Sequence, residues 1–279
     1  PEHYHEILKR IKKRTKKPIG VNIIVNKGNK RQDLDLKYAL EEGVDLFITS
    51  LGNPKEVIKQ AHKNGAKVIC DVTNLEHALK VQDMGADGVV AVSSGAGGHA
   101  GPTSPFVLVP WLKQKLSIPV VAAGGVADGR TMASALCLGA SAVHVGTRFI
   151  ASTEAQVGQD YKQAIVDSNP EDIVLTSRIS GTPCSFINTD YVKKMGKDLP
   201  FVVEKLKKNK TAKKYIVPLI YYLGSKQLEE SAQDSKDSKQ VWCAGQSVGL
   251  IDEVLSCKEI VENIVREYTE AVQQLPKNI

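Results

Sequence analysis

Short apolar runs recur along the first 150 residues, and each is followed by a stretch that is apolar on one side and charged on the other. Two of these stretches, Pro54 to Asn64 and Leu75 to Met84, have the spacing of helices that cover a sheet. The apolar runs begin roughly 20 to 30 residues apart, about the length of one βα unit. They lie at residues 20–25, 46–50, 67–72, 88–92, 120–123 and 142–145. The pattern predicts six parallel strands that alternate with helices.

Glycines mark the ends of helices in the same repeat. Four of the predicted helices end in a glycine that precedes the next apolar run, at Gly43, Gly65, Gly85 and Gly139. Glycine is the residue that most easily adopts the left-handed conformation with which many helices end. The helices are therefore expected to stop at these positions.

Six parallel strands are compatible with two architectures. The first is an α/β fold of the TIM (β/α)8-type barrel in which this chain carries strands three to eight. It would require two further βα units of about 30 residues each before Pro1, and the chain does not begin with methionine. The second is a complete open sheet of six strands. The residues at the ends of the last two strands favour the barrel.

Composition excludes several classes of protein. With 42% hydrophobic and 24% charged residues, the chain resembles an ordinary soluble protein. The net charge of +6 arises largely from residues 9–17 and 205–214, which a solvated surface explains better than a nucleic-acid groove. The five cysteines include no C-x-x-C pair, so neither a disulfide framework nor a metal site is indicated. We expect a cytoplasmic protein without a nucleic-acid or membrane partner.

A single histidine, His99, lies in a glycine-rich loop directly after the fourth apolar run. Glycines at positions 95, 97, 98 and 101 let a planar ligand approach the backbone, and imidazole is a base near neutral pH. Parallel α/β enzymes keep their chemistry at this end of their strands. The alternative is a flexible turn with an incidental histidine. We predict that His99 is catalytic.

The ends of the last two strands suggest a phosphate site. Gly124 and Gly125 follow the fifth run and precede a predicted helix start, while Gly146 and Thr147 follow the sixth run. Loops after the last two strands of a barrel commonly bind phosphate, and helix starts offer free N–H groups to anions. The alternative is two unremarkable strand-to-helix turns. The sequence thus predicts a bound flavin mononucleotide (FMN) or a phosphorylated substrate near His99.

Five segments resemble those of a known family. From about residue 18 to residue 265 the chain is similar to the nitronate monooxygenase (2-nitropropane dioxygenase) family, which includes the flavin-type enoyl-ACP reductases. The resemblance implies an FMN-dependent barrel with a small, largely helical second domain. The segments that carry it are residues 20–22, 97–99, 122–125, 146–149 and 244–251.

The resemblance also implies roles for individual residues. It implies that Gly125, Gly146 and Thr147 hold the FMN phosphate, that Asn22 and Gly98 lie near the flavin ring, and that His99 is the active-site base. The predicted cofactor-binding set is Asn22, Gly97, Gly98, Gly124, Gly125, His144, Gly146, Thr147 and Gln246.

Three features depart from the family pattern. The two glycine-rich strand ends with which family members begin are absent from this sequence. His144 stands where many relatives carry glutamine, and Asp71 occupies a position that is usually apolar.

Two domains are expected. Residues 1–154 and 241–279 would form the FMN-binding barrel portion, with a last helix over Cys257 to Gln273, and residues 155–240 a helical cap that shapes the substrate pocket.

The predicted activity is FMN-dependent oxidation of nitronates or nitroalkanes by dioxygen to carbonyl compounds and nitrite. One alternative is an NAD(P)H-dependent flavin enoyl-ACP reductase, whose acyl carrier protein would bind the basic residues 205–214. Another is a truncated, non-catalytic barrel module. The sequence predicts neither the physiological substrate nor the oligomeric state.

Overall fold

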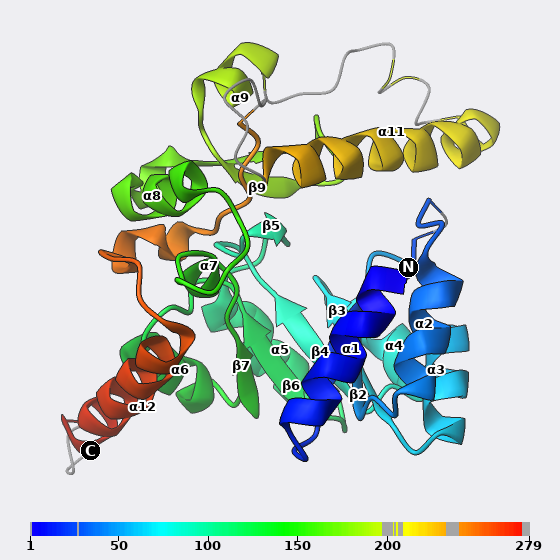
Figure 1. The fold of residues 1–279 in the computed structure, drawn as a ribbon, viewed down its shortest axis with the longest axis horizontal. Helices are drawn as coiled ribbons and strands as arrows, with labels where there is room; N and C mark the ends of the chain where they lie inside the picture. The colour runs from blue at the N-terminus through cyan, green and yellow to red at the C-terminus, as the bar shows by residue number, and fades with distance from the viewer. Residues whose placement is uncertain are drawn as a thin grey trace.

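Six parallel strands form one curled sheet in the computed structural model, which describes residues 2–26, 28–196, 203, 205, 209–232 and 240–274 (Figure 1). The strand order is β1-β2-β3-β4-β6-β7, so β1 and β7 are its two edges. The strands are β1 (Gly20–Ile24), β2 (Leu46–Ser50), β3 (Lys67–Val72), β4 (Gly88–Val92), β6 (Val120–Ala123) and β7 (Ala142–His144). Each of the six predicted apolar runs forms one strand, and the fold is an α/β half-barrel.

Helices connect the strands and cover the outer face of the sheet (Figure 1). A core of buried residues such as Phe47 and Val89 from the strands and Leu108 and Leu112 from α5 lies between the two layers. The helices of this part are α1 (Glu2–Arg14), α2 (Gln32–Glu41), α3 (Lys55–Lys63), α4 (Leu75–Asp83), α5 (Pro105–Lys115) and α6 (Gly129–Cys137). The glycines predicted to end helices have φ between +62° and +95°, which confirms their left-handed conformation.

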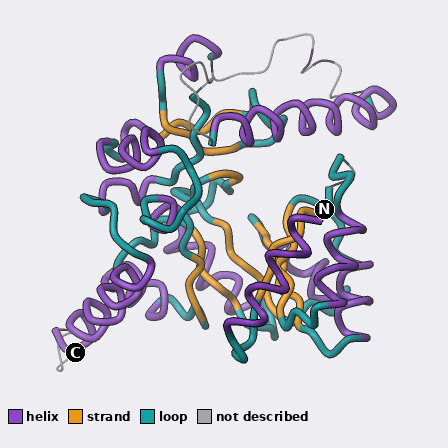
Figure 2. The backbone as a smooth tube through the Cα atoms, in the orientation of Figure 1, coloured by secondary structure: helices purple, strands orange, loops and turns teal. Residues whose placement is uncertain are grey.

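A second region lies above the carboxyl ends of the strands (Figure 2). It contains α8 (Gln159–Asp167), η1 (Pro170–Asp172), β8 (Ile173–Thr176), β9 (Cys184–Ile187), α9 (Asp190–Met195) and α11 (Lys210–Ser231). Strands β8 and β9 form an antiparallel sheet with β5 (Gly98–His99), a two-residue strand from the glycine-rich loop. The expectation of a helical cap is therefore not confirmed, because a sheet accompanies the helices.

The chain then returns to the half-barrel through η2 (Gln246–Leu250), which lies near α7 (Thr147–Ile150), and ends in α12 (Cys257–Gln274). Helix α12 matches the predicted last helix and packs against α6 (Figure 1). Gly129 permits this packing, because a Cβ there would collide with the backbone at Tyr268. None of the helices within the described ranges is long and apolar enough to cross a membrane.

Candidate active site

A cavity of about 400 Å³ lies at the carboxyl ends of the parallel strands and is lined by residues from all six of them. Its volume falls in the range typical of small-molecule sites. It brings together nine of the ten residues predicted from the sequence, namely Asn22, Gly97, Gly98, His99, Gly124, Gly125, His144, Gly146 and Thr147. These nine residues come from β1, β5 and β7, from the first residue of the short helix that follows β7, and from the loops after β4, β6 and β7.

Gln246 is the predicted residue that does not line this cavity. Its side chain is exposed at the start of η2 and borders a neighbouring hollow that shares Gly124, Gly125 and Ser247 with the main pocket. Ser247 lines both cavities, but no sequence pattern distinguishes it from its neighbour. A cofactor-binding role for Gln246 stays a prediction.

Hydrogen bonds define the orientation of the His99 ring. Its Nε2 lies 2.9 Å from Ser180 Oγ, and that hydroxyl donates to the carbonyl oxygen of Thr182 over 3.0 Å. A hydroxyl has one proton to donate, so Ser180 accepts a hydrogen bond from His99. The proton of the neutral ring therefore lies on Nε2, and Nδ1 keeps its lone pair.

Burial also sets the charge of His99. The half-buried ring lies on strand β5, with Cys184 of β9 as its partner residue. Desolvation lowers the pKa of His99 from its ordinary value of 6.5, because water no longer stabilises the imidazolium form. At neutral pH the side chain is thus an uncharged base whose Nδ1 has no partner among the residues that the structure describes. The sequence identified the histidine, but not Ser180, which lies 81 positions away.

The paired glycines Gly124 and Gly125 form an open turn after β6, with φ of +110° and +76°. Within the described part of the chain, no group accepts a hydrogen bond from the backbone N–H of either glycine or of Val126. Such free amides can bind the oxygens of an anion.

The start of helix α6 has fewer free backbone N–H groups than the sequence suggested. Asp128 Oδ1 accepts from the N–H of Thr131 over 2.7 Å, and Glu267 Oε2 accepts from the N–H of Gly129 over 3.0 Å. Two carboxylates thus occupy these N–H groups. Among the described residues, the N–H groups without an acceptor lie in the preceding glycine turn, and anion binding there stays a prediction.

Gly97 lies where three loops meet. A Cβ at this position would lie 2.8 Å from the Gly245 nitrogen and 2.9 Å from Thr147 Oγ1, closer than side chains normally approach. The Gly245 N–H donates to Thr147 Oγ1 over 3.0 Å, and the Gln246 N–H donates to the Gly95 carbonyl. The buried Thr147 hydroxyl accepts this bond and keeps its own proton available for a ligand.

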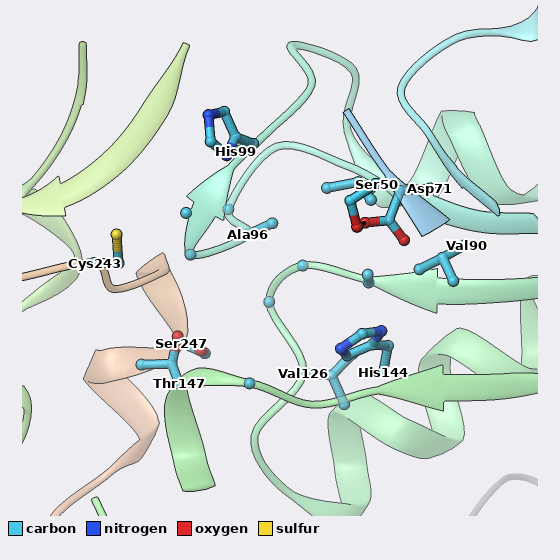
Figure 3. Close-up of a pocket in the computed structure, with 18 of the residues that line it drawn as sticks. Ser50, Asp71, Val90, Ala96, His99, Val126, His144, Thr147, Cys243 and Ser247 are labelled. Atoms are coloured by element: carbon cyan, nitrogen blue, oxygen red, sulfur yellow. Dashed lines mark hydrogen bonds between the residues drawn. The ribbon is translucent and has the colours of Figure 1, made fainter. Parts of the chain in front are cut away.

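A polar row crosses the wall of the pocket opposite His99. Asn22 Nδ2 donates to Ser50 Oγ over 3.0 Å, and Ser50 Oγ donates to Asp71 Oδ2 over 2.6 Å. Burial raises the pKa of Asp71, and the hydrogen bond from Ser50 and the charge of His144 oppose this shift. The side chains of Asp71 and His144 extend toward one another from strands β3 and β7 (Figure 3). Asp71 is the one carboxylate in strand β3, and this is the sequence feature that could have pointed to the polar row.

Comparison with known proteins gives the family. A family model described as nitronate monooxygenase matches residues 1–267. The chain belongs to the nitronate monooxygenase family. It is 30% identical to a "Probable nitronate monooxygenase" of Staphylococcus saprophyticus, over 90% of this chain and 71% of that protein. The family assignment makes the chain an oxidoreductase.

The chain is also similar to a second curated protein and to a solved structure. The chain is 28% identical to a Rhodococcus jostii protein named "(3aS,4S,5R,7aS)-5-hydroxy-7a-methyl-1-oxo-octahydro-1H-indene-4-carboxyl-CoA dehydrogenase", over 94% of this chain and 80% of that one. The solved structure of FabK from Thermotoga maritima superposes with a TM-score of 0.81 at 34% identity, covering 97% of this chain and 82% of that chain. The half-barrel therefore has the arrangement found in solved structures of related enzymes.

Proposed function

We propose that this protein oxidises nitronates, or the nitroalkanes from which they form, with FMN as cofactor and dioxygen as electron acceptor. The observation that carries the proposal is the neutral His99, whose Nδ1 is free in a pocket that also contains unpaired loop amides. An uncharged base next to an anion-binding turn suits a reaction that removes a proton and binds a phosphorylated cofactor.

The residues of the pocket fit an FMN molecule. The free N–H groups of Gly124, Gly125 and Val126, together with the Thr147 hydroxyl, supply donors for a phosphate. Gly98, where an added Cβ would meet no atom within 4 Å, leaves the backbone bare at one wall of the pocket. When bound, the flavin supplies electron transfer between substrate and dioxygen. We assign the cofactor-binding roles predicted from the sequence on this basis.

His99 handles the proton in this proposal. A neutral nitroalkane must lose its α-proton to become a nitronate, and Nδ1 accepts that proton. Ser180 holds the ring through Nε2, so the base does not need to reorient before it reacts. A preformed nitronate has already lost the proton and makes no such demand.

The described residues of the region 155–240 support His99 from outside the lining of the pocket. The region supplies Ser180, which holds His99, and strand β9, which pairs with the strand that carries His99. We propose that this region is the substrate domain, and that residues 1–154 and 241–279 bind the cofactor. The basic residues 205–214, proposed as a carrier-protein contact, lie mostly outside the described side chains.

A flavin-dependent reaction on an acyl thioester is the second candidate. Two similarities favour it: the 34% identity to FabK and the match to a protein whose name ends in "indene-4-carboxyl-CoA dehydrogenase". In this case a nicotinamide such as NADPH would reduce the flavin, and the pocket would bind an enoyl thioester. The nitronate reaction remains our main proposal because the family model carries that description.

The test is an absorption spectrum of purified protein, followed by anaerobic mixing with a nitronate, NADH or NADPH in separate cuvettes. We expect a yellow protein whose flavin is reduced by the nitronate and by neither nicotinamide. Bleaching by a nicotinamide alone would establish the second candidate. A protein that stays colourless after incubation with FMN would contradict both.

A further inference from the structure

Two polar residues behind Asn22 determine which atom of its side-chain amide faces the pocket. Asn22 lies on β1, Ser50 on β2 and Asp71 on β3, three neighbouring strands of the sheet. The strand pairing places Ile24 beside Ser50 and Asp71 beside Val90, so the carboxyl group lies in the row that forms the inner face. Asp71 and Ser50 are thus fixed by the sheet itself.

The direction of the hydrogen bonds follows from the proton count. Ser50 has a single hydroxyl proton, and it donates this proton to Asp71 Oδ2 over 2.6 Å. Ser50 can therefore only accept from Asn22, which must present Nδ2, its donor, at 3.0 Å. The amide of Asn22 is planar, so its Oδ1 is turned away from Ser50.

No described residue donates a hydrogen bond to Asn22 Oδ1, and Asn22 lines the candidate pocket. An amide oxygen presented in this way accepts from an N–H group of a bound molecule. If the amide were reversed, it would present donors instead, which repel that N–H. The orientation of one side chain thus selects between two kinds of ligand.

We propose that Asp71 is a positioning residue that, through Ser50, holds the Asn22 amide with its oxygen toward the bound flavin, where it accepts from the imide N–H of the ring. This inference rests on the proposed binding of FMN. Asp71 does not touch the ligand in this arrangement. Asp71 accepts the hydrogen bond from the Ser50 hydroxyl, so Ser50 can only accept the hydrogen bond from Asn22.

The substitution Asp71→Asn tests the inference because it reverses the chain of hydrogen bonds. An asparagine amide at position 71 can donate to Ser50, which then donates to Asn22 Oδ1 and turns the amide around. We expect the dissociation constant of FMN, measured by quenching of its fluorescence, to rise roughly three- to tenfold, the usual effect of one hydrogen bond.

A double-mutant cycle separates this role from a merely structural one. Asn22 and Asp71 lie on strands that do not pair with each other and communicate through Ser50. We expect Asp71→Asn to weaken FMN binding in the wild-type background and to have no effect in an Asn22→Ala background. Ser50→Ala should abolish the coupling in the same way. Circular dichroism and Tm confirm that each variant is folded.

Two outcomes contradict the proposal in distinguishable ways. If FMN binds and the effects of Asn22→Ala and Asp71→Asn are additive, the positioning role is wrong and the proposed function is unaffected. If the wild-type protein and all variants fail to bind FMN, both the proposed function and this inference are wrong.

Discussion

At the scale of single residues, His99 combines a lowered pKa with a proton held on Nε2. We expect His99→Asn to reduce kcat/KM for a neutral nitroalkane by roughly 10²- to 10⁴-fold, the usual contribution of a general base. Turnover of the corresponding preformed nitronate should change little, because no proton has to be removed. Steady-state oxygen consumption with each substrate provides the measurement. Equal losses on both substrates would refute the assignment.

The pH dependence of the nitroalkane reaction follows from the same residue. Only the neutral form of His99 accepts a proton, so activity falls as the pH drops through its pKa. Because burial lowers that pKa, the loss of kcat/KM should occur below pH 6.5. A profile of kcat/KM against pH tests this prediction, and the nitronate reaction serves as the control because it should lack this step. A loss of activity already centred above pH 6.5 would contradict the assigned environment.

Ser180 supports His99 without reacting. Ser180→Ala removes the acceptor for the Nε2 proton and releases the ring, so we expect kcat/KM for a nitroalkane to fall roughly tenfold, the value of one buried hydrogen bond. Nitronate turnover should be unaffected. Ser180→Thr keeps a hydroxyl and should retain most of the kcat/KM for the nitroalkane. Ser141→Ala, at an exposed position just before β7, is the matched control. No change in the nitroalkane reaction would show that Ser180 does not orient the base.

At the scale of elements, the contact between α6 and α12 depends on one small residue. Gly129→Ala places a methyl group against the α12 backbone at Tyr268 and disturbs the bond from the Gly129 N–H to Glu267. Overpacking of this kind costs about 1–3 kcal/mol, which corresponds to a decrease in Tm of roughly 2–10 °C. Thermal unfolding followed by circular dichroism measures it. Ser134→Ala, exposed on the same helix, should leave Tm nearly unchanged.

The elements also show what the sequence could predict. Runs such as 46–50 and 67–72 became strands with the expected bounds, because buried parallel strands have continuous apolar runs. Strand β5 could not be predicted, since two residues in a glycine-rich loop have no periodicity. Its existence depends on β9, which lies more than 80 positions away and pairs with it only in the folded chain.

The candidate site was predictable to a similar degree. Glycines such as Gly97 and Gly125 and the lone His99 stand out in the sequence because of their neighbours. Ser180 and Glu267 do not, because each acts through a contact with a distant part of the chain. Sequence patterns report local geometry, whereas the partners of a catalytic residue are set by long-range packing.

At the scale of the whole molecule, cofactor binding and folding should be linked. FMN at about 100 times its dissociation constant should stabilise the folded state by about 2.7 kcal/mol and raise Tm by roughly 5–10 °C. Riboflavin lacks the phosphate and should produce a smaller increase at the same concentration, since it leaves the amides of Gly124 and Gly125 unpaired. Differential scanning fluorimetry compares the two ligands. Equal shifts would indicate that these amides do not bind the phosphate.

The pairing of β5 with β9 divides the chemistry between two parts of the fold. The open turn at Gly124 and Gly125 belongs to the half-barrel, whereas His99 is hydrogen-bonded into the upper sheet, and among the described strands β9 is the one neighbour of β5. Any displacement of β9 relative to the half-barrel would therefore carry the base with it and leave the turn behind. Proton removal therefore depends on where β9 lies relative to the half-barrel, although the flavin-phosphate donors proposed at Gly124 and Gly125 do not.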